Sequence, residues 1–287
     1  MIVVENLSFT YPGSASPTLE RLDFEIADGE ILGFLGPSGA GKSTTQRILI
    51  GLLEGYGGRA EVMGKEVRDW GPSLYESIGV SFELPNHHQR LTALENLQHF
   101  GALYEGPMLD PLEVLRWVDL EADADKRVSD FSKGMKIRLN VARSLLHRPK
   151  LLFLDEPTSG LDPVNAKRVK DLVRRLQSEG TTVFVTTHDM SVAESLCDRV
   201  AFICDGGIAA LDSPAALEKR YGSRTVAVEW QRPSGELETE TFPLDALGND
   251  PRFLELLQGG THIETLHSQE TTLENVFIEV TGQRLHA

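Results

Sequence analysis

Residues 31–44 read ILGFLGPSGAGKST, and this stretch decides the fold of the chain. Its first five residues form a short, continuously apolar run, as expected of a buried strand. A glycine-rich loop over residues 36–43 comes next, and we expect a helix over about residues 43–53. The spacing G-x-x-x-x-G-K-S between a strand and a helix is that of a phosphate-binding loop. The sequence therefore predicts an α/β domain that binds a nucleotide.

The residue types in this phosphate loop suit a triphosphate. Glycines let successive backbone N–H groups turn toward phosphate oxygens, and the N-terminus of the following helix adds its positive dipole end. We expect Lys42 to reach the β- and γ-phosphates and the Ser43 hydroxyl to hold Mg²⁺. The expected nucleotide-binding residues here are Gly36, Pro37, Ser38, Gly39, Ala40, Gly41, Lys42, Ser43 and Thr44.

Strand patterns surround the loop. Residues 2–35 alternate short β-rich runs with turns, and Asp28-Gly29 is a hairpin signal, so we expect an antiparallel sheet at the start of the chain. Short apolar runs over residues 78–82, 151–154 and 182–185 are separated by helical segments. That alternation is typical of a parallel sheet with crossover helices.

Two regions depart from this pattern. Over about residues 84–136 the strand signal disappears and apolar residues recur at helical spacing, which indicates a helical subdomain. Residues 223–287 return to strand and helix patterns and end in a helix with a capping box of Thr271 and Glu274. We therefore expect a nucleotide-binding domain over residues 1–220, with a mostly parallel sheet and flanking helices, and a small C-terminal α+β appendage.

An acidic pair, Asp155-Glu156, follows the apolar run at residues 151–154. At the carboxyl edge of a parallel sheet these carboxylates would reach the same crevice as the phosphate loop. Asp155 suits the shell of Mg²⁺, and Glu156 points elsewhere, toward a water in line with the γ-phosphate. The alternative interpretation is an acidic N-cap of the next helix. The phosphate loop favours the hydrolytic interpretation.

The composition limits the location and the partners. Lys and Arg total 28 against 43 Asp and Glu, a formal net charge of −15, which disfavours non-specific binding to nucleic acid. Cys197 and Cys204 lie in apolar surroundings, as small core residues do in a reducing compartment. No apolar run approaches the roughly 18 residues that crossing a bilayer requires, and the first residues lack the layout of a secretory signal. We therefore expect a cytoplasmic protein without a nucleic-acid partner.

Residues 131–163 read FSKGMKIRLNVARSLLHRPKLLFLDEPTSGLDP, with a signature segment, a helix, the carboxylate strand and a Ser-Gly-Leu-Asp turn in this order. This order resembles the ABC ATPase family, and the resemblance extends over residues 2 to about 220. It implies a P-loop NTPase core and two domains that meet head to tail over two ATP molecules. Ser132, Lys133 and Gly134 would then face the γ-phosphate bound by the other copy, and Asp162 would cross the interface.

The same resemblance implies roles for two further residues. Tyr11 matches the aromatic residue that stacks on adenine, although a strand-end aromatic in the core is the alternative. His188, after the strand VFVTT, matches the switch histidine that contacts the γ-phosphate and Glu156. With Lys42 and Glu156, His188 completes the expected catalytic set.

Two positions depart from the family pattern. Glu83 stands where the family usually has Gln; it still offers an oxygen to Mg²⁺, so the expected metal ligands are Ser43, Glu83 and Asp155. The signature is Phe-Ser-Lys-Gly-Met over residues 131–135 rather than Leu-Ser-Gly-Gly-Gln, which adds a cation and removes an amide. A Ser-Lys-Gly signature together with the ending LENVFIEVTG is similar to the drug and antibiotic exporter branch.

The resemblance implies a cytoplasmic ATP-binding subunit that hydrolyses Mg·ATP to drive a separate membrane permease. Its implied partners are a second ATPase subunit, either identical or a close paralogue, and the permease, which holds it at the inner face of the membrane. An importer motor, a soluble ABC ATPase and a regulator without hydrolysis are the alternatives. A drug, antibiotic, lipid or other small molecule fits the exporter branch, and the sequence leaves the cargo open, because the translocation path belongs to the permease.

Overall fold

The protein is described by a computed structural model that covers residues 1–222, 225–232, 235–258, 261–269 and 272–283. The chain divides into two compact units, Met1–Pro214 and Ala215–Gln283. Helix α7 (Pro214–Tyr221) thus groups with the second unit except for its first residue, although its sequence lies before the boundary expected near residues 220–223.

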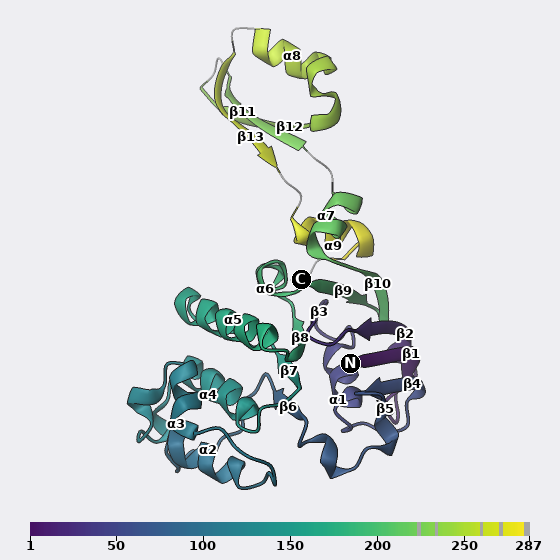
Figure 1. The fold of residues 1–287 in the computed structure, drawn as a ribbon. Coiled ribbons are helices and arrows are strands. Elements are labelled where there is room, and N and C mark those ends of the chain that lie inside the picture. Colours follow the sequence, from purple (N-terminus) through teal and green to yellow (C-terminus); the bar gives the residue numbers. More distant parts are fainter. Residues whose placement is uncertain (223–224, 233–234, 259–260, 270–271, 284–287) are drawn as a thin grey trace. The chain divides into compact units, whose positions relative to one another are not determined.

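The central sheet of the first unit is mostly parallel, as expected, and has the strand order β10-β9-β3-β8-β7-β6 (Figure 1). All neighbouring pairs are parallel except β10 with β9. Strand β3 is buried at every residue, which explains its uninterrupted apolar sequence. The strands are Ile31–Leu35 (β3), Ile78–Ser81 (β6), Leu151–Asp155 (β7), Thr182–Thr187 (β8), Arg199–Cys204 (β9) and Gly207–Asp212 (β10).

A second, antiparallel sheet has the order β2-β1-β4-β5 and consists of Ile2–Phe9 (β1), Leu19–Ile26 (β2), Gly57–Val62 (β4) and Lys65–Glu66 (β5). The expected antiparallel start is confirmed, but the hairpin at Asp28-Gly29 is wrong. Gly29 does turn the chain with a φ of +74°, yet the turn joins β2 to β3 of the other sheet. The dipeptide specifies a local reversal, whereas the buried apolar surface of β3 selects its parallel neighbours.

Helix α1 (Lys42–Leu49) and both sheets contribute to one hydrophobic cluster, which includes Leu22, Phe34, Ile48 and Phe184. The helix ends before the expected residue 53. Gly51 adopts a φ of +73°, and its N–H donates to the carbonyl of Ile48 at 2.9 Å. A glycine in this left-handed conformation stops a helix because it redirects the backbone.

The region expected to be helical, about residues 84–136, contains α2 (Ala93–Gly101), α3 (Pro111–Trp117) and the first turn of α4 (Lys133–Leu145), which continues beyond it. Each begins at a side chain that accepts a backbone N–H bond: Thr92, Asp110 and Ser132. The remaining helices of the first unit are α5 (Pro163–Ser178) and α6 (Met190–Leu196), and short 3-10 turns lie at Val67–Asp69 (η1), Pro72–Leu74 (η2), Glu121–Asp123 (η3) and Val128–Asp130 (η4).

The second unit contains an antiparallel sheet of order β12-β11-β13, formed by Thr225–Gln231 (β11), Leu237–Pro243 (β12) and His262–Gln269 (β13). Its inner residues pack with α8 (Pro251–Gln258), and the cluster is Val226, Val228, Trp230, Phe242, Phe253 and Leu256. The 3-10 helix η5 (Leu244–Asn249) precedes α8. Strand β12 has no apolar alternation in its sequence LETETFP, so the pattern did not indicate it.

Helix α9 (Leu273–Thr281) ends the described chain, with Leu273, Val276 and Phe277 buried. Its cap is Thr272, whose hydroxyl accepts the N–H of Asn275 at 3.3 Å. The expected capping partner Thr271 lies outside the described residues. Among the helices that the structure describes, none is long and apolar enough to span a bilayer.

His87 lies in the polar loop after β6 and is buried. Its Nε2 bonds to the carbonyl of Lys136 in α4 at 2.9 Å, so this nitrogen carries the proton. Within the described residues its buried Nδ1 has no partner. Burial lowers the pKa of His87 to about 4; the hydrogen bond to the Lys136 carbonyl opposes this shift, and the nearby charges of Arg143 and Lys136 add to it.

We expect this histidine to make the first unit sensitive to acid. The pKa of His87 is about 4 in the folded chain and 6.5 in the unfolded chain. The contribution of neutral His87 to the free energy of unfolding is therefore fully present above pH 6.5 and is lost as the pH falls toward 4. At lower pH the loss is about 3 kcal/mol. Denaturant unfolding between pH 7 and pH 4 measures it. In His87→Gln, whose amide can still donate to the carbonyl, this part of the acid dependence should disappear; an unchanged slope would contradict the assignment.

Candidate nucleotide-binding site

A cavity of about 530 Å³ opens beside the phosphate loop. We call it the phosphate-loop cavity. Loops that follow β6, β7 and β8 meet there, because parallel strands deliver their carboxyl ends to one edge of a sheet. Its size lies within the range of small-molecule sites. Its walls consist of Tyr11, Thr18, Ser38, Gly39, Gly41, Lys42, Ser43, Thr44, Glu83, Asp155, Glu156 and His188.

Two glycines of the loop are required by its backbone. A Cβ at Gly36 would lie 2.1 Å from the carbonyl oxygen of Ile203 in β9, so only glycine lets the loop pass this strand. Gly41 caps helix α1 with a φ of +110°, a conformation that side chains disfavour. The loop is thereby pressed against the sheet and turned so that the N-terminus of α1 faces the cavity.

Lys42 lies across this loop. Its Nζ donates hydrogen bonds to the carbonyls of Gly36 at 2.6 Å and Pro37 at 3.0 Å. Burial lowers the pKa of Lys42, and the negative charges of Glu156, Asp155 and Glu83 oppose that shift. The cavity therefore presents a half-buried cation among acidic groups that come from other segments of the chain.

The acidic groups favour a divalent cation. Burial raises the pKa of Asp155; a hydrogen bond from Thr186 Oγ1 opposes the shift, and the charge of Glu83 adds to it. Two carboxylates and the hydroxyl of Ser43 in one cavity are hard oxygen donors of the kind Mg²⁺ selects. The described residues contain no cluster of three or more His, Cys, Asp or Glu side chains that could hold a metal ion, so phosphate oxygens and water would supply the other ligands.

Glu156 is held in a strained and well-defined position. Its φ is +49°, an uncommon value for a residue with a side chain, and this bend separates its direction from that of Asp155. Oε2 accepts a hydrogen bond from Thr187 Oγ1 at 3.0 Å, and Oε1 accepts the backbone N–H of His188 at 3.0 Å. His188 Nδ1 lies 2.6 Å from the same Oε1. The structure thus brings together the two residues expected to act on the γ-phosphate side.

Thr186 and Thr187 were not singled out as site residues by sequence reasoning. Both are fully buried at the end of β8, and their hydroxyls orient Asp155 and Glu156 respectively. Two threonines just before the histidine were the available signal, because a polar pair at the end of an apolar strand needs partners.

Tyr11 lines the cavity from the other side. Its hydroxyl lies 3.2 Å from Thr44 Oγ1, and its ring packs edge-on against Phe9 with the centroids 4.9 Å apart. Tyr11 therefore packs against Phe9 and also lines the cavity, so core packing and a contact with a base are compatible.

The signature residues do not line this cavity. Ser132 caps α4 by accepting the N–H of Met135 at 3.2 Å, and Asp162 caps α5 by accepting those of Val164 and Asn165. The Lys133 side chain lies along the following turn, where its Nζ would be 3.0 Å from a Cβ at Gly160. A Cβ at Gly134 would meet Leu161 at 3.2 Å. The signature and the Asp162 turn therefore form one surface of the chain.

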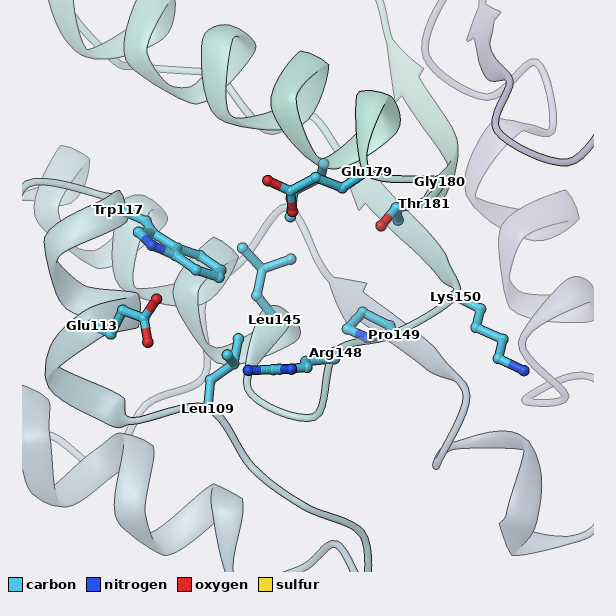
Figure 2. A pocket seen from close by; sticks show the side chains of 11 residues that line it. Leu109, Glu113, Trp117, Leu145, Arg148, Pro149, Lys150, Glu179, Gly180 and Thr181 are labelled. Atoms are coloured by element: carbon cyan, nitrogen blue, oxygen red, sulfur yellow. The ribbon is translucent and has the colours of Figure 1, made fainter.

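A separate cavity of about 510 Å³ lies where α3, the end of α4 and the end of α5 meet. Figure 2 shows Trp117, Leu145 and Leu109 close to one another in its wall. None of the expected site residues belongs to this wall, and its charged groups are of mixed sign. It is therefore distinct from the phosphate-loop cavity.

Comparison with known proteins agrees with this geometry. The ABC transporter family model matches residues 19–159, and a fluoroquinolone efflux ABC transporter C-terminal domain matches residues 224–270. A fluoroquinolones export ATP-binding protein of Mycobacterium tuberculosis (strain ATCC 25618 / H37Rv) is 54% identical over 285 residues, 99% of this chain and 94% of the relative. A Nod factor export ATP-binding protein I of Rhizobium sp. (strain N33) is 35% identical over 92% of each chain.

Solved structures show the same fold. An ATP-binding cassette solved as a dimer in a post-hydrolysis state with ADP and phosphate has a TM-score of 0.68 and 29% identity, covering 74% of this chain and 98% of that one. The structure of an ATP-binding subunit of an ABC transporter has a TM-score of 0.70 and 28% identity, and the match covers 77% of this chain and 93% of that one. The resemblance inferred from the motifs is thus confirmed: the chain belongs to the ABC transporter family, as an ATP-binding subunit of the kind that couples ATP hydrolysis to transport.

Proposed function

We propose that the chain binds Mg·ATP in the phosphate-loop cavity and hydrolyses it to drive a separate membrane permease that exports a small drug-like molecule. One observation carries the catalytic part of this proposal. Lys42, Asp155 and Glu156 come from distant segments of the chain and line one cavity. A cation, a hard-metal ligand and a base in a single crevice are the groups that phosphoryl transfer to water requires.

Each group has a role that follows from its position. The loop N–H groups and Lys42 bind the β- and γ-phosphates, and Tyr11 stacks on the base. Ser43, Asp155 and Glu83 would hold Mg²⁺, which when bound offsets the charge of the phosphates. Glu156 orders an attacking water and accepts its proton, because two hydrogen bonds hold its carboxylate in place. His188 lies beside it, toward the γ-phosphate.

The second ATPase subunit supplies the other side of the site. Ser132, Lys133, Gly134 and Asp162 lie outside the chain's own phosphate-loop cavity, so they serve a nucleotide only if that nucleotide is bound by another copy. The N-terminus of α4 at Ser132 offers backbone N–H groups and a positive dipole end to a γ-phosphate. The similar cassette that was solved as a dimer supports pairing.

Export is favoured over import and over a soluble role by the second unit. The relative named for fluoroquinolone export is similar over nearly the whole chain, and the efflux-type domain match falls on β11 to β13. The cargo class we propose is therefore fluoroquinolone-like, and the permease would hold the subunit at the inner face of the membrane. Identification of the membrane protein that co-purifies with the chain tests this part.

A groove of about 830 Å³ provides a surface for the permease. It lies between the central sheet and the helical region, and several apolar side chains of its wall are exposed: Leu52 at 53%, Tyr75 at 41%, Phe82 at 37% and Leu103 at 68%. Phe82 and Asn86 of this wall lie on either side of Glu83 in the sequence, so a bound permease segment would touch the loop that carries Glu83.

Replacement of Lys42 by Ala should weaken nucleotide binding by about a hundredfold, because it removes charge-assisted hydrogen bonds to the phosphates. Isothermal titration with ATP measures this. Lys65→Ala is the control, since that lysine is exposed and outside the cavity. Wild-type affinity in Lys42→Ala would refute the assignment of the phosphate loop.

The Glu156→Gln variant should lose at least about a hundredfold in kcat while it still binds ATP, because the amide cannot take a proton from water. ATP-bound dimers should then accumulate and be visible by size-exclusion chromatography. Glu179→Gln, at an exposed position outside the cavity, should behave as the wild type. Unchanged turnover in Glu156→Gln would remove this residue from its role.

Introducing a charge in the groove should separate the chain from its permease. In Leu103→Asp we expect about tenfold less permease in co-purification, because a buried leucine contact is replaced by a desolvated carboxylate. Leu237→Asp changes a leucine of similar exposure in the second unit and serves as control. Thermal unfolding of both variants shows whether they are folded. Equal recovery of the permease in the two would place the docking surface elsewhere.

A further inference from the structure

Helix α4 binds the segment that leads from β6 to Glu83. Asn140 Nδ2 donates to Ser81 Oγ at 2.9 Å and to the carbonyl of Phe82 at 2.7 Å. Asn140 is 1% exposed and Ser81 is 2% exposed, so the bond between them is shielded from water, and the bond to Phe82 is partly shielded. Each is consequently stronger, and costlier to leave unmade, than a bond at the surface.

Three further hydrogen bonds extend this connection. Arg143 donates to the carbonyl of Asn86 at 2.9 Å and to Asn140 Oδ1 at 2.7 Å. His87 donates to the carbonyl of Lys136 at 2.9 Å. The positions 136, 140 and 143 lie on one face of α4, so a single helix face holds residues 81–87.

Glu83 itself lacks such support. In the part of the chain that the structure describes, its carboxylate makes no hydrogen bond or ion pair, although it lines the phosphate-loop cavity. Its neighbour Phe82 lines the apolar groove. The placement of the carboxylate therefore depends on the backbone that Asn140 holds one residue earlier.

We propose that Asn140 is a positioning residue for ATP hydrolysis, which fixes the Glu83 carboxylate in the phosphate-loop cavity by binding the backbone at Phe82 to helix α4. This rests on the proposed role of Glu83 toward Mg·ATP. The side chain is suited to the task, because its amide donates two bonds and its oxygen accepts one from Arg143. Ser132 of the signature caps the N-terminus of α4. The same helix therefore links Glu83, at the nucleotide of its own chain, to the signature residues proposed to contact the nucleotide of the other copy.

A double-mutant cycle tests the proposal. Asn140→Ala should lower kcat by about tenfold while the affinity for ATP changes by less than about twofold, because the phosphate loop is untouched. In a Glu83→Ala background the same substitution should cost less than about twofold, since no carboxylate is left to position. A merely structural role of Asn140 would lower kcat by the same factor in both backgrounds, and that result overturns the proposal.

Arg138→Met is the matched control. Arg138 is also a buried donor on α4, but it holds the carbonyls of Val118 and Asp119 after α3 and not the Glu83 segment. Arg138→Met should change kcat by the same factor in the wild-type and in the Glu83→Ala background. Hydrogen exchange without nucleotide gives a second readout: amides of residues 82–88 should exchange faster in Asn140→Ala and not in Arg138→Met. Equal exchange of these amides in both variants would also count against the proposal.

Failure of the proposed function is distinguishable from failure of this inference. If Glu83→Ala alone hydrolyses ATP at the wild-type rate, the role of Glu83 is wrong and the proposal falls with it. If Glu83→Ala is impaired but the cycle is additive, only the positioning role is wrong. If Asn140→Ala does not fold, Ser81→Ala replaces it, because this variant removes one of the two acceptors of Asn140. Ser81→Ala should lower kcat less than Asn140→Ala, and this loss should vanish in the Glu83→Ala background. A loss of kcat that persists in that background refutes the proposal.

Discussion

The charge balance around Lys42 is the interaction on which the site depends. A partly buried ammonium is costly unless negative groups compensate it. Glu156, Asp155 and Glu83 supply this compensation, and they arrive from loops after two different strands. The parallel strand order β3-β8-β7-β6 brings these carboxylates to the edge of the sheet where Lys42 lies, and it is therefore also what makes the half-buried cation tolerable. The same carboxylates are hard oxygen donors of the kind that a divalent cation selects.

Several residues serve the fold and the proposed function at once. Ser132 and Asp162 each cap a helix through ordinary hydrogen bonds, which alone would justify their presence. A capped helix N-terminus is also a preformed anion site, because its first N–H groups point outward. The exposed surface that these two caps share with Lys133 would thus acquire its function only when a second copy brings a triphosphate to it.

Much of the core could be predicted because its signals are local. The apolar run before Gly36, the glycine spacing and the polar residues after each buried strand indicated the parallel sheet and the carboxylates proposed to be catalytic. The Asp28-Gly29 hairpin was wrong because a turn signal carries no information on which sheet receives the next strand. Strand β12 was missed because its acidic residues reach neighbours such as Arg252 instead of following an apolar alternation. The burial of His87 was missed because its partner, the carbonyl of Lys136, lies 49 residues away.

By itself, the sequence determined the phosphate loop, the buried strands and the chemical types of the site residues, since glycine spacing and apolar runs act through the nearest neighbours in the chain. The tertiary structure alone decided the strained bend at Glu156, the threonines that orient the two carboxylates, and the bond from Asn140 to the backbone before Glu83. Those features join residues that are far apart in the chain, and the physical reason for them is the requirement that every buried polar group find a partner in the packed fold.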